Sequence, residues 1–210
     1  MAEVKKLIIY GAGGLGKEVK ALLDAINKKE PLWDFVGFID DDHEKENVLG
    51  GIEFLKNTDN RISVIVAIGS PMIKSKIVDK LNDIPNIDYP ILIHPSAVIM
   101  DEENISIGKG SVITAGVVIT TDVKIGEHVL LNLNTTIGHD TEIGHFSSLM
   151  PGVNVAGGVT IEYEVMVGSG ANILNGVKLG SGSIIGAGAV VLDHVDNNIT
   201  VVGVPAKKIK

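Results

Sequence analysis

A six-residue repeat of aliphatic positions dominates the second half of the chain. Counting in steps of six from Ile107, every position up to Val191 is aliphatic, fifteen in succession, and the position four places after each one is small or β-branched. A period of six fits neither an amphipathic helix nor a coiled coil, but it fits short strands joined by tight corners. Hexapeptide repeats of this kind are typical of a parallel β-helix.

The repeat also predicts how the coils of this β-helix are built. Three hexads would form one triangular coil, so fifteen hexads predict five coils, with the large aliphatic residue of each hexad on the axis. Glycines such as Gly126 and Gly138 directly follow an axis position, which suits a backbone that must turn sharply there.

Both ends of the repeat are expected to be atypical. A six-residue count begins early but lies two residues out of phase with the main series, so residues 91–106 are expected to form an irregular first turn that caps the prism; its members are Ile93, Ile99 and Ile105. Residues 197–210 leave the repeat and would cap the other end or pack against a neighbouring subunit.

The first ninety residues have a different pattern, in which apolar runs alternate with helical spacing. Strands are expected at Leu7–Tyr10, Trp33–Asp40 and Ile62–Ile68, with helices after the first and third of them, the second over Met72–Leu81. Strand and helix in alternation favour a small Rossmann-like unit with a parallel sheet. The chain is therefore divided into an α/β domain, residues 1–90, and an all-β helix domain, residues 91–210.

Composition narrows the function classes. The chain has no cysteine, which excludes disulfide frameworks, thiolate metal sites and a cysteine nucleophile. A net charge of −8 without a lysine-rich block argues against a nucleic-acid partner. No apolar run is long enough to span a membrane, and no signal-peptide layout is present, so a cytoplasmic location is expected.

A glycine-rich turn follows the first predicted strand. Gly11–Gly16 matches the pattern G-x-G-x-x-G between a strand and a helix, where the backbone can approach a phosphate closely. Asp40 lies at the end of the second predicted strand, where a carboxylate could bond a ribose hydroxyl. These features favour a bound nucleotide or sugar nucleotide, and the alternative is a tight turn that simply requires glycine. The domain is too short for a complete dinucleotide fold.

Among six histidines, His139 is the strongest catalytic candidate because Asp140 follows it directly. A histidine near neutral pKa is a competent base at pH 7, and a neighbouring carboxylate can fix its tautomer. Spacing alone leaves solvated surface as the commoner alternative. The other histidines are expected to face outward, to be solvated or to lack a nameable partner: His43, His94, His128, His145 and His194.

These motifs together resemble a known family. The hexads, the segment Ile137-Gly-His139-Asp140, the closing Gly203-Val-Pro-Ala-Lys207 and the opening Ile9-Tyr10-Gly-Ala-Gly-Gly14 are similar to those of the sialic acid O-acetyltransferase family. That family comprises left-handed β-helix acyltransferases and includes bacterial UDP-sugar N-acetyltransferases of bacillosamine type. The resemblance, not the spacing, implies a left-handed coil, a homotrimer with active sites between subunits, and acetyl-CoA as co-substrate.

The resemblance also implies roles for individual residues. His139 would be the general base, with Asp140 as the acid that raises its basicity. Acetyl-CoA would lie in the groove between two prisms, against Ser148, Gly157, Ser169 and Ala187. A sugar nucleotide would bind the N-terminal domain at Gly13, Gly14, Leu15, Asp40, Asp41 and Gly69.

The expected reaction is acetyl transfer from acetyl-CoA to the amino group of a nucleotide-linked deoxyaminosugar, by direct transfer in a ternary complex. Leu15 departs from bacillosamine-type enzymes, which can carry a substrate-contacting histidine there, so the identity of the sugar stays open. O-acetylation of sialic acid or a related sugar is one alternative, and a non-catalytic nucleotide-binding scaffold is another. No metal is expected, because His139 and His145 lack a convincing third ligand for a carbonic-anhydrase-type site.

Overall fold

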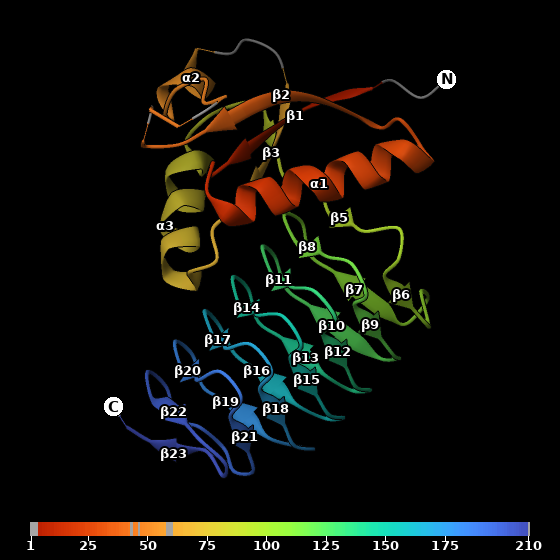
Figure 1. The fold of residues 1–210 in the computed structure, drawn as a ribbon, viewed down its shortest axis with the longest axis vertical. Helices are drawn as coiled ribbons and strands as arrows, with labels where there is room; N and C mark the ends of the chain where they lie inside the picture. The colour runs from red at the N-terminus through yellow and green to blue at the C-terminus, as the bar shows by residue number, and fades with distance from the viewer. Residues whose placement is uncertain (1–3, 43, 46, 58–60, 210) are drawn as a thin grey trace.

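The computed structural model describes residues 4–42, 44–45, 47–57 and 61–209, arranged as two units along its long axis (Figure 1). An α/β unit lies at one end, and a triangular solenoid of short strands extends from it to the C-terminus. The predicted fold class, a small parallel sheet with helices followed by a left-handed parallel β-helix, is confirmed.

The α/β unit contains a four-stranded sheet in the order β2-β1-β3-β4, with every neighbouring pair parallel. Its elements are β1 (Lys5–Tyr10), α1 (Gly14–Lys29), β2 (Trp33–Ile39), α2 (Glu53–Lys56), β3 (Ile62–Val66), α3 (Pro71–Asn82) and β4 (Ile87–Asp88). All three predicted strands and both predicted helices are present, whereas α2 and β4 are too short to leave a periodic signal in the sequence.

Strands β1 and β3 lie at the centre of the sheet, which explains why their residues are mostly apolar. The residues of β1 from Leu7 to Tyr10 and all of β3 are buried, as expected of parallel strands covered on both faces. Helix α1 buries Val19, Leu22 and Leu23 on one side, as expected of an amphipathic helix packed on a sheet. The carboxyl ends of β1 and β3, which are adjacent in the sheet, lead directly into the N-termini of α1 and α3.

The β-helix has three faces, named here in chain order. The first face consists of β5 (Leu92–Ile93), β8 (Val112–Ile113), β11 (Leu130–Leu131), β14 (Ser148–Leu149), β17 (Met166–Val167), β20 (Ile184–Ile185), β22 (Thr200–Val202) and β23 (Lys207–Lys208). The second face consists of β6 (Val98–Ile99), β9 (Val118–Ile119), β12 (Thr136–Ile137), β15 (Asn154–Val155), β18 (Asn172–Ile173) and β21 (Val190–Val191). The third face consists of β7 (Ile105–Ile107), β10 (Val123–Ile125), β13 (Glu142–Ile143), β16 (Thr160–Ile161) and β19 (Lys178–Leu179).

The strand register confirms three hexads per coil. Ile125 pairs with Ile143, and Ile143 pairs with Ile161, so each coil advances the chain by eighteen residues. The axis residues of the repeat form one continuous buried core, in which each contacts its equivalents in the coils before and after it.

The glycines after the axis positions serve a different purpose from the one expected. Gly126 and Gly138 do not adopt a positive φ; a Cβ on either would lie 2.7 Å or 2.6 Å from the backbone nitrogen of the next coil. The left-handed turn residue comes two places later, as at Asp140 (φ 56°) and Gly158 (φ 68°). Close approach between coils, rather than the turn itself, therefore excludes a side chain at Gly126 and Gly138.

The first turn is more regular than the phase break suggested. Strands β5 and β6 pair in parallel with β8 and β9, so residues 92–107 form a full coil, and the helix has about six coils rather than five. Ile99 pairs with Ile119, twenty residues on, whereas Ile107 pairs with Ile125, eighteen residues on. The two extra residues lie in the turn between β6 and β7, which explains the shift in phase.

The two units share a hydrophobic core. Leu92, Val112 and Leu130, which point outward from the first face, pack with Leu7 and Leu22 of the α/β unit. The predicted boundary at residues 90 and 91 falls between β4 and β5, but this shared core crosses it. The α/β unit is therefore held in place against the first face by apolar burial, not tethered by a linker.

Candidate functional site

The predicted catalytic pair lies at a corner of the β-helix between its second and third faces. His139 and Asp140 follow β12 and precede β13, and the Nδ1 atom of His139 lies 2.7 Å from Oδ2 of Asp140. Both side chains are well exposed, at 61% and 69%. With Nδ1 hydrogen-bonded to the carboxylate, Nε2 is left as the nitrogen that can accept a proton.

The backbone of this corner is fixed from both sides. The amide of Asp140 donates to the carbonyl of Thr121 in the coil before (3.3 Å), and the amide of Gly158 donates to the carbonyl of His139 (2.7 Å). Asp140 has a left-handed φ of 56°, a conformation that aspartate tolerates better than most residues. The coil stacking thus sets the position of the pair, together with the hydroxyl of Thr141, which donates to the carbonyl of His139 (3.5 Å).

The residues predicted to contact acetyl-CoA do not all share one surface. Ser169 and Ala187 are exposed and lie one coil apart, at the corner between the first and second faces. Gly157 lies at the His139 corner, buried directly below the imidazole. Ser148 is completely buried, and its hydroxyl accepts a hydrogen bond from Nζ of Lys74 on α3 (3.0 Å). A cofactor in the groove has no access to that hydroxyl.

The glycine-rich turn forms an open cradle at the carboxyl end of β1. Gly13 and Gly14 are exposed, and a Cβ built on either meets nothing within 4 Å, so the space beside them is free. Helix α1 begins there without a side-chain cap and without an acidic residue in its first turn. Its first backbone N–H groups and the positive end of its dipole are therefore available to an anion.

The two neighbouring aspartates have defined partners. Oδ2 of Asp40 accepts a hydrogen bond from the amide of Ala12 (2.8 Å), and Nζ of Lys45 lies 3.0 Å from Oδ1. Partial burial alone would raise the pKa of Asp40, but these bonds and one from the amide of Asp42 lower it. Asp41 accepts a hydrogen bond from the hydroxyl of Tyr10 (3.0 Å). Asp40 therefore holds the backbone of the glycine-rich turn in place through its hydrogen bond with Ala12.

Burial and these hydrogen bonds also affect Tyr10. Desolvation, followed by the hydrogen bond to Asp41 and the charges of both aspartates, raises the pKa of Tyr10 to about 12. Its phenol therefore stays protonated as a donor to Asp41 at any physiological pH.

Leu15 and Gly69 complete the predicted substrate residues. Leu15 is partly buried and packs into the core shared with the first face of the β-helix. Gly69 lies at the carboxyl end of β3 just before α3, and a Cβ on it would lie 3.6 Å from Cε of Met150. Met150 follows β14, so this edge of the α/β unit lies against the corner between the first and second faces, next to α3 (Figure 1).

The structure therefore brings the predicted substrate residues together with one another but not with His139 of the same chain. The glycine-rich turn, Asp40 and Gly69 meet at one edge of the sheet, beside the corner at Met150. His139 lies at the next corner along the coil, with the second face between the two.

His128 was expected to face outward, and this prediction is wrong. Its side chain is only 2% exposed, stacked on Phe146 (5.2 Å between ring centroids) and edge-on to Tyr89 (4.7 Å). Burial first, and the charges of Lys74 and Lys109 next, lower the pKa of His128 to about 4. The docking of the α/β unit covers this corner, which the local sequence could not indicate.

The remaining described histidines have backbone partners that explain them. Nδ1 of His145 accepts from the amide of Glu127 (3.0 Å), and Nδ1 of His194 accepts from the amide of Lys178 (3.0 Å). Nδ1 of His94 accepts from the amide of Ser96 (3.1 Å) and also lies 2.8 Å from the hydroxyl of Ser96. His43 lies outside the described residues. Among the residues that the structure describes, no three histidine or acidic side chains are grouped to hold a metal ion.

Lys74 is buried, which was not predicted from the sequence. It is 3% exposed, and burial lowers the pKa of its amine to about 7. Its position on the first turn of α3 looks like any solvated lysine in the sequence, because the surface that covers it belongs to a distant segment. Lys74 and His128 line one small cavity between the two units together with Leu15.

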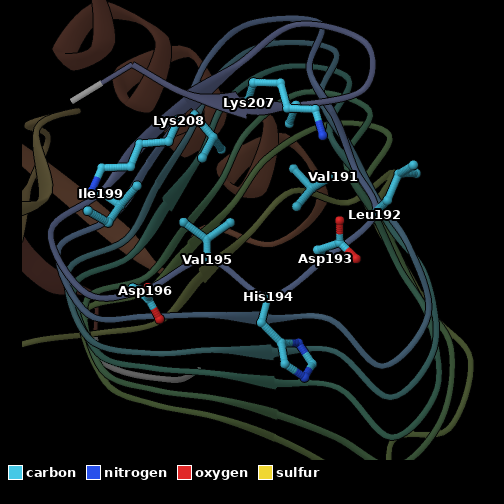
Figure 2. A pocket seen from close by; sticks show the side chains of 11 residues that line it. Val191, Leu192, Asp193, His194, Val195, Asp196, Ile199, Lys207 and Lys208 are labelled. Atoms are coloured by element: carbon cyan, nitrogen blue, oxygen red, sulfur yellow. The ribbon is translucent and has the colours of Figure 1, made fainter.

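A larger pocket lies at the C-terminal end of the β-helix, where the axis opens (Figure 2). It has a volume of about 180 Å³, and Val191 and Val195 point into it while the ring of His194 points away. Lys207 and Lys208 of β23 cross its rim. None of the predicted site residues lines this pocket.

Across the described chain, no helix combines the length and apolar character needed to cross a bilayer.

Comparison with protein families matches both halves of the chain separately. Residues 6–81 match the model of the PglD N-terminal domain, and residues 97–121 and 158–193 match the hexapeptide repeat of succinyl-transferase. A search of curated protein sequences gave no significant match.

Solved structures match over almost the full length. A perosamine N-acetyltransferase from Caulobacter crescentus, in complex with CoA and GDP-perosamine, is 28% identical with a TM-score of 0.89 and covers 99% of this chain and 98% of its own. The acetyltransferase domain of PglB from Neisseria gonorrhoeae is 29% identical, with a TM-score of 0.87 and coverage of 98% and 100%.

A third structure, WeeI from Acinetobacter baumannii, is 30% identical with a TM-score of 0.87, and the match covers 98% of this chain and all of WeeI. Identity at this level over both units, with both family models in the expected order, establishes the relationship. The chain belongs to the family of hexapeptide-repeat, left-handed β-helix acyltransferases that carry a PglD-type N-terminal domain.

Proposed function

We propose that this protein transfers the acetyl group of acetyl-CoA to the amino group of a nucleotide-linked deoxyaminosugar. The observation that carries this proposal is the exposed His139–Asp140 pair, hydrogen-bonded at 2.7 Å, on a corner of a β-helix whose relatives include a perosamine N-acetyltransferase in complex with CoA and GDP-perosamine. The open glycine cradle at Gly13 and Gly14 supplies a second binding surface suited to phosphate.

The proposed chemistry is direct transfer. Nε2 of His139 takes a proton from the acceptor amine as its nitrogen bonds to the thioester carbonyl carbon. Asp140, accepting a hydrogen bond from Nδ1–H, stabilises the imidazolium that forms. The tetrahedral intermediate then collapses, the C–S bond breaks, and the proton passes from His139 to the departing CoA sulfur. No acyl-enzyme is required.

The backbone amide of Gly157 is the proposed donor to the oxyanion of that intermediate. Gly157 lies against the Nε2 edge of His139, and within the described part of the chain its N–H has no hydrogen-bond partner. A fixed donor aimed at developing charge is usually a large contribution to acyl transfer.

The co-substrate is proposed to run along the corners of the β-helix. Ser169 and Ala187 are small and exposed, and so leave room for an extended chain to lie close to the backbone. Ser148 is left out of this surface because Lys74 and α3 cover it.

The nucleotide sugar is proposed to bind at the carboxyl edge of the small sheet. Its phosphates would lie at Gly13 and Gly14, against the N-terminus of α1. Asp41 and Gly69 would border the nucleotide or sugar, and Asp40 would act chiefly by holding the turn through Ala12. Leu15 would contribute an apolar wall, since it packs toward the β-helix.

A homotrimer with sites between subunits fits this arrangement. Within one chain the nucleotide cradle and His139 lie at different corners of the β-helix. A cyclic trimer would place the cradle of one subunit against the His139 corner of its neighbour.

A thiol-release assay tests the proposal directly. Purified protein is given acetyl-CoA with UDP- and GDP-linked aminosugars, with their hydroxyl analogues, and with free sialic acid. Thiol release with an aminosugar nucleotide, and about 10²–10⁴-fold less with the variant His139→Ala, is the expected result. Release only with hydroxyl acceptors would replace N-acetylation by O-acetylation, and full turnover by His139→Ala would remove His139 as the base.

A further inference from the structure

The imidazole of His139 rests directly on Gly157, the equivalent residue one coil later. A Cβ built on Gly157 would lie 2.4 Å from Nε2, 2.5 Å from Cε1 and 2.9 Å from Cδ2 of His139. Non-bonded carbon and nitrogen atoms pack at about 3.5 Å or more. The ring therefore occupies the space that any side chain at position 157 would need.

The repeat shows that this glycine is exceptional. The equivalent position, two places after each axis residue, occurs fifteen times between Lys109 and Asp193, and Gly157 is the single glycine among them. The others all carry a side chain: Lys109, Ala115, Thr121, Glu127, Leu133, His139, His145, Pro151, Tyr163, Ser169, Asn175, Ser181, Ala187 and Asp193.

The backbone does not require glycine at this position. Gly157 does not adopt a positive φ, and the left-handed turn of its corner falls on the next residue, Gly158 (φ 68°). The fourteen equivalent residues with side chains show that the corner accommodates a Cβ elsewhere. The contact with His139 is therefore the one steric reason for glycine here that the described structure offers.

We propose that Gly157 is a positioning residue: its missing side chain forms the seat that holds the His139 ring against Asp140. This role rests on the proposed function, in which His139 is the base. With alanine at 157 the ring must move by about 1 Å to reach ordinary contact. The left-handed backbone of Asp140 is held by the hydrogen bond of its amide to Thr121 and does not shift with the ring, so the 2.7 Å contact to Nδ1 is expected to lengthen.

The displacement should cost little stability. The His139 side chain is 61% exposed, so it can rotate into solvent without opening a cavity. The amide of Gly157 is also kept in Gly157→Ala, so the proposed oxyanion donor is unchanged. Activity and folding are thus expected to separate.

The test is a double-mutant cycle in the thiol-release assay. Gly157→Ala is expected to lower kcat about 10²-fold, as misplacement by about 1 Å can, with KM for acetyl-CoA within about twofold and an unchanged melting temperature. In a His139→Ala background, Gly157→Ala should cost nothing further, because the group through which it acts is gone. Asn175→Ala, at the same corner one coil below, is the control and should keep wild-type kcat.

Three results would overturn the role of Gly157. They are wild-type kcat in Gly157→Ala, an equal further loss in the His139→Ala background, or a rise in KM alone; the last two would mean that the glycine makes room for acetyl-CoA instead. A crystal structure of Gly157→Ala tests the role without measuring activity. Nδ1 of His139 should lie more than 3.5 Å from the Asp140 carboxylate, and a retained contact would show that Gly157 does not position the ring. Full turnover by His139→Ala would instead reject the proposed function itself.

Discussion

At the scale of single residues, only a few contacts hold the His139 side chain in the candidate site. The carboxylate of Asp140 and the glycine at position 157 set the position of the imidazole ring. Both are placed by neighbouring coils, since Thr121 holds the Asp140 backbone and Gly157 lies below the imidazole. Substitutions here should therefore change chemistry more than stability.

Asp140→Asn tests the carboxylate. Asparagine tolerates the left-handed φ of 56° and can still accept one hydrogen bond, so the corner should keep its shape while the negative charge is lost. We expect kcat to fall by about 10- to 100-fold, less than for His139→Ala, because the base remains but its cation is less stabilised. Steady-state thiol release measures this.

Asp122→Asn is the matched control, since Asp122 holds the same left-handed corner position one coil earlier (φ 54°). It should retain wild-type kcat. Equal losses in both variants would mean that the effect comes from the corner rather than from the pair.

At the scale of elements, the contact between α3 and the first face is the least expected feature. A lysine amine lies beneath the helix with hydroxyl and carbonyl partners, Ser148 at 3.0 Å and Ser147 at 3.5 Å, and with His128 as its titratable neighbour. Because burial lowers the pKa of Lys74 from 10.5 to about 7, the folded state releases a proton that the unfolded chain still holds between these values.

The direction in which pH changes the stability follows from this lowered pKa of Lys74. Where the unfolded chain binds more protons, stability rises with pH, so the Lys74 contribution is least favourable below pH 7 and improves up to about pH 10.5. Lys74→Met should flatten this rise, which amounts to at most about 1.4 kcal/mol per pH unit. Urea unfolding from pH 7 to 10 measures it. Lys76→Met, exposed on the same helix, should leave the slope intact, and an unchanged slope in Lys74→Met would show that Lys74 does not cause it.

At the scale of the whole molecule, the question is which chain supplies which half of the site. Within one chain, the cradle at Gly14 and the base at His139 lie beside different corners of the β-helix. The proposed trimer joins them across a subunit interface.

Mixed oligomers test this arrangement. Gly14→Trp should fill the cradle without disturbing the fold, since a Cβ built at this exposed position meets nothing within 4 Å. Each variant alone, Gly14→Trp or His139→Ala, should be nearly inactive. Co-expressed and purified through two tags, they should recover about a third of wild-type turnover, because in every mixed cyclic trimer one site in three pairs two intact halves. No recovery in verified mixed trimers would place the whole site within one chain.

The sequence was sufficient for everything set by local repetition. Fifteen axis positions predicted the strands and the eighteen-residue coil, and strand–helix alternation predicted the sheet and helices of the α/β unit. The adjacency of His139 and Asp140 indicated that a carboxylate could reach the imidazole, and the two side chains are hydrogen-bonded at 2.7 Å. Resemblance to a family supplied the chemical roles, which periodicity alone does not carry.

Only the tertiary structure decided what happens where distant segments meet. Docking of the α/β unit on the first face buried His128 and Ser148, which the repeat treats like any other outward positions, together with Lys74 of α3. Coil stacking placed Gly157 beneath His139, eighteen residues away in the chain. The physical reason is common to both: a period fixes which way a side chain points, but what covers it depends on contacts between residues far apart in sequence.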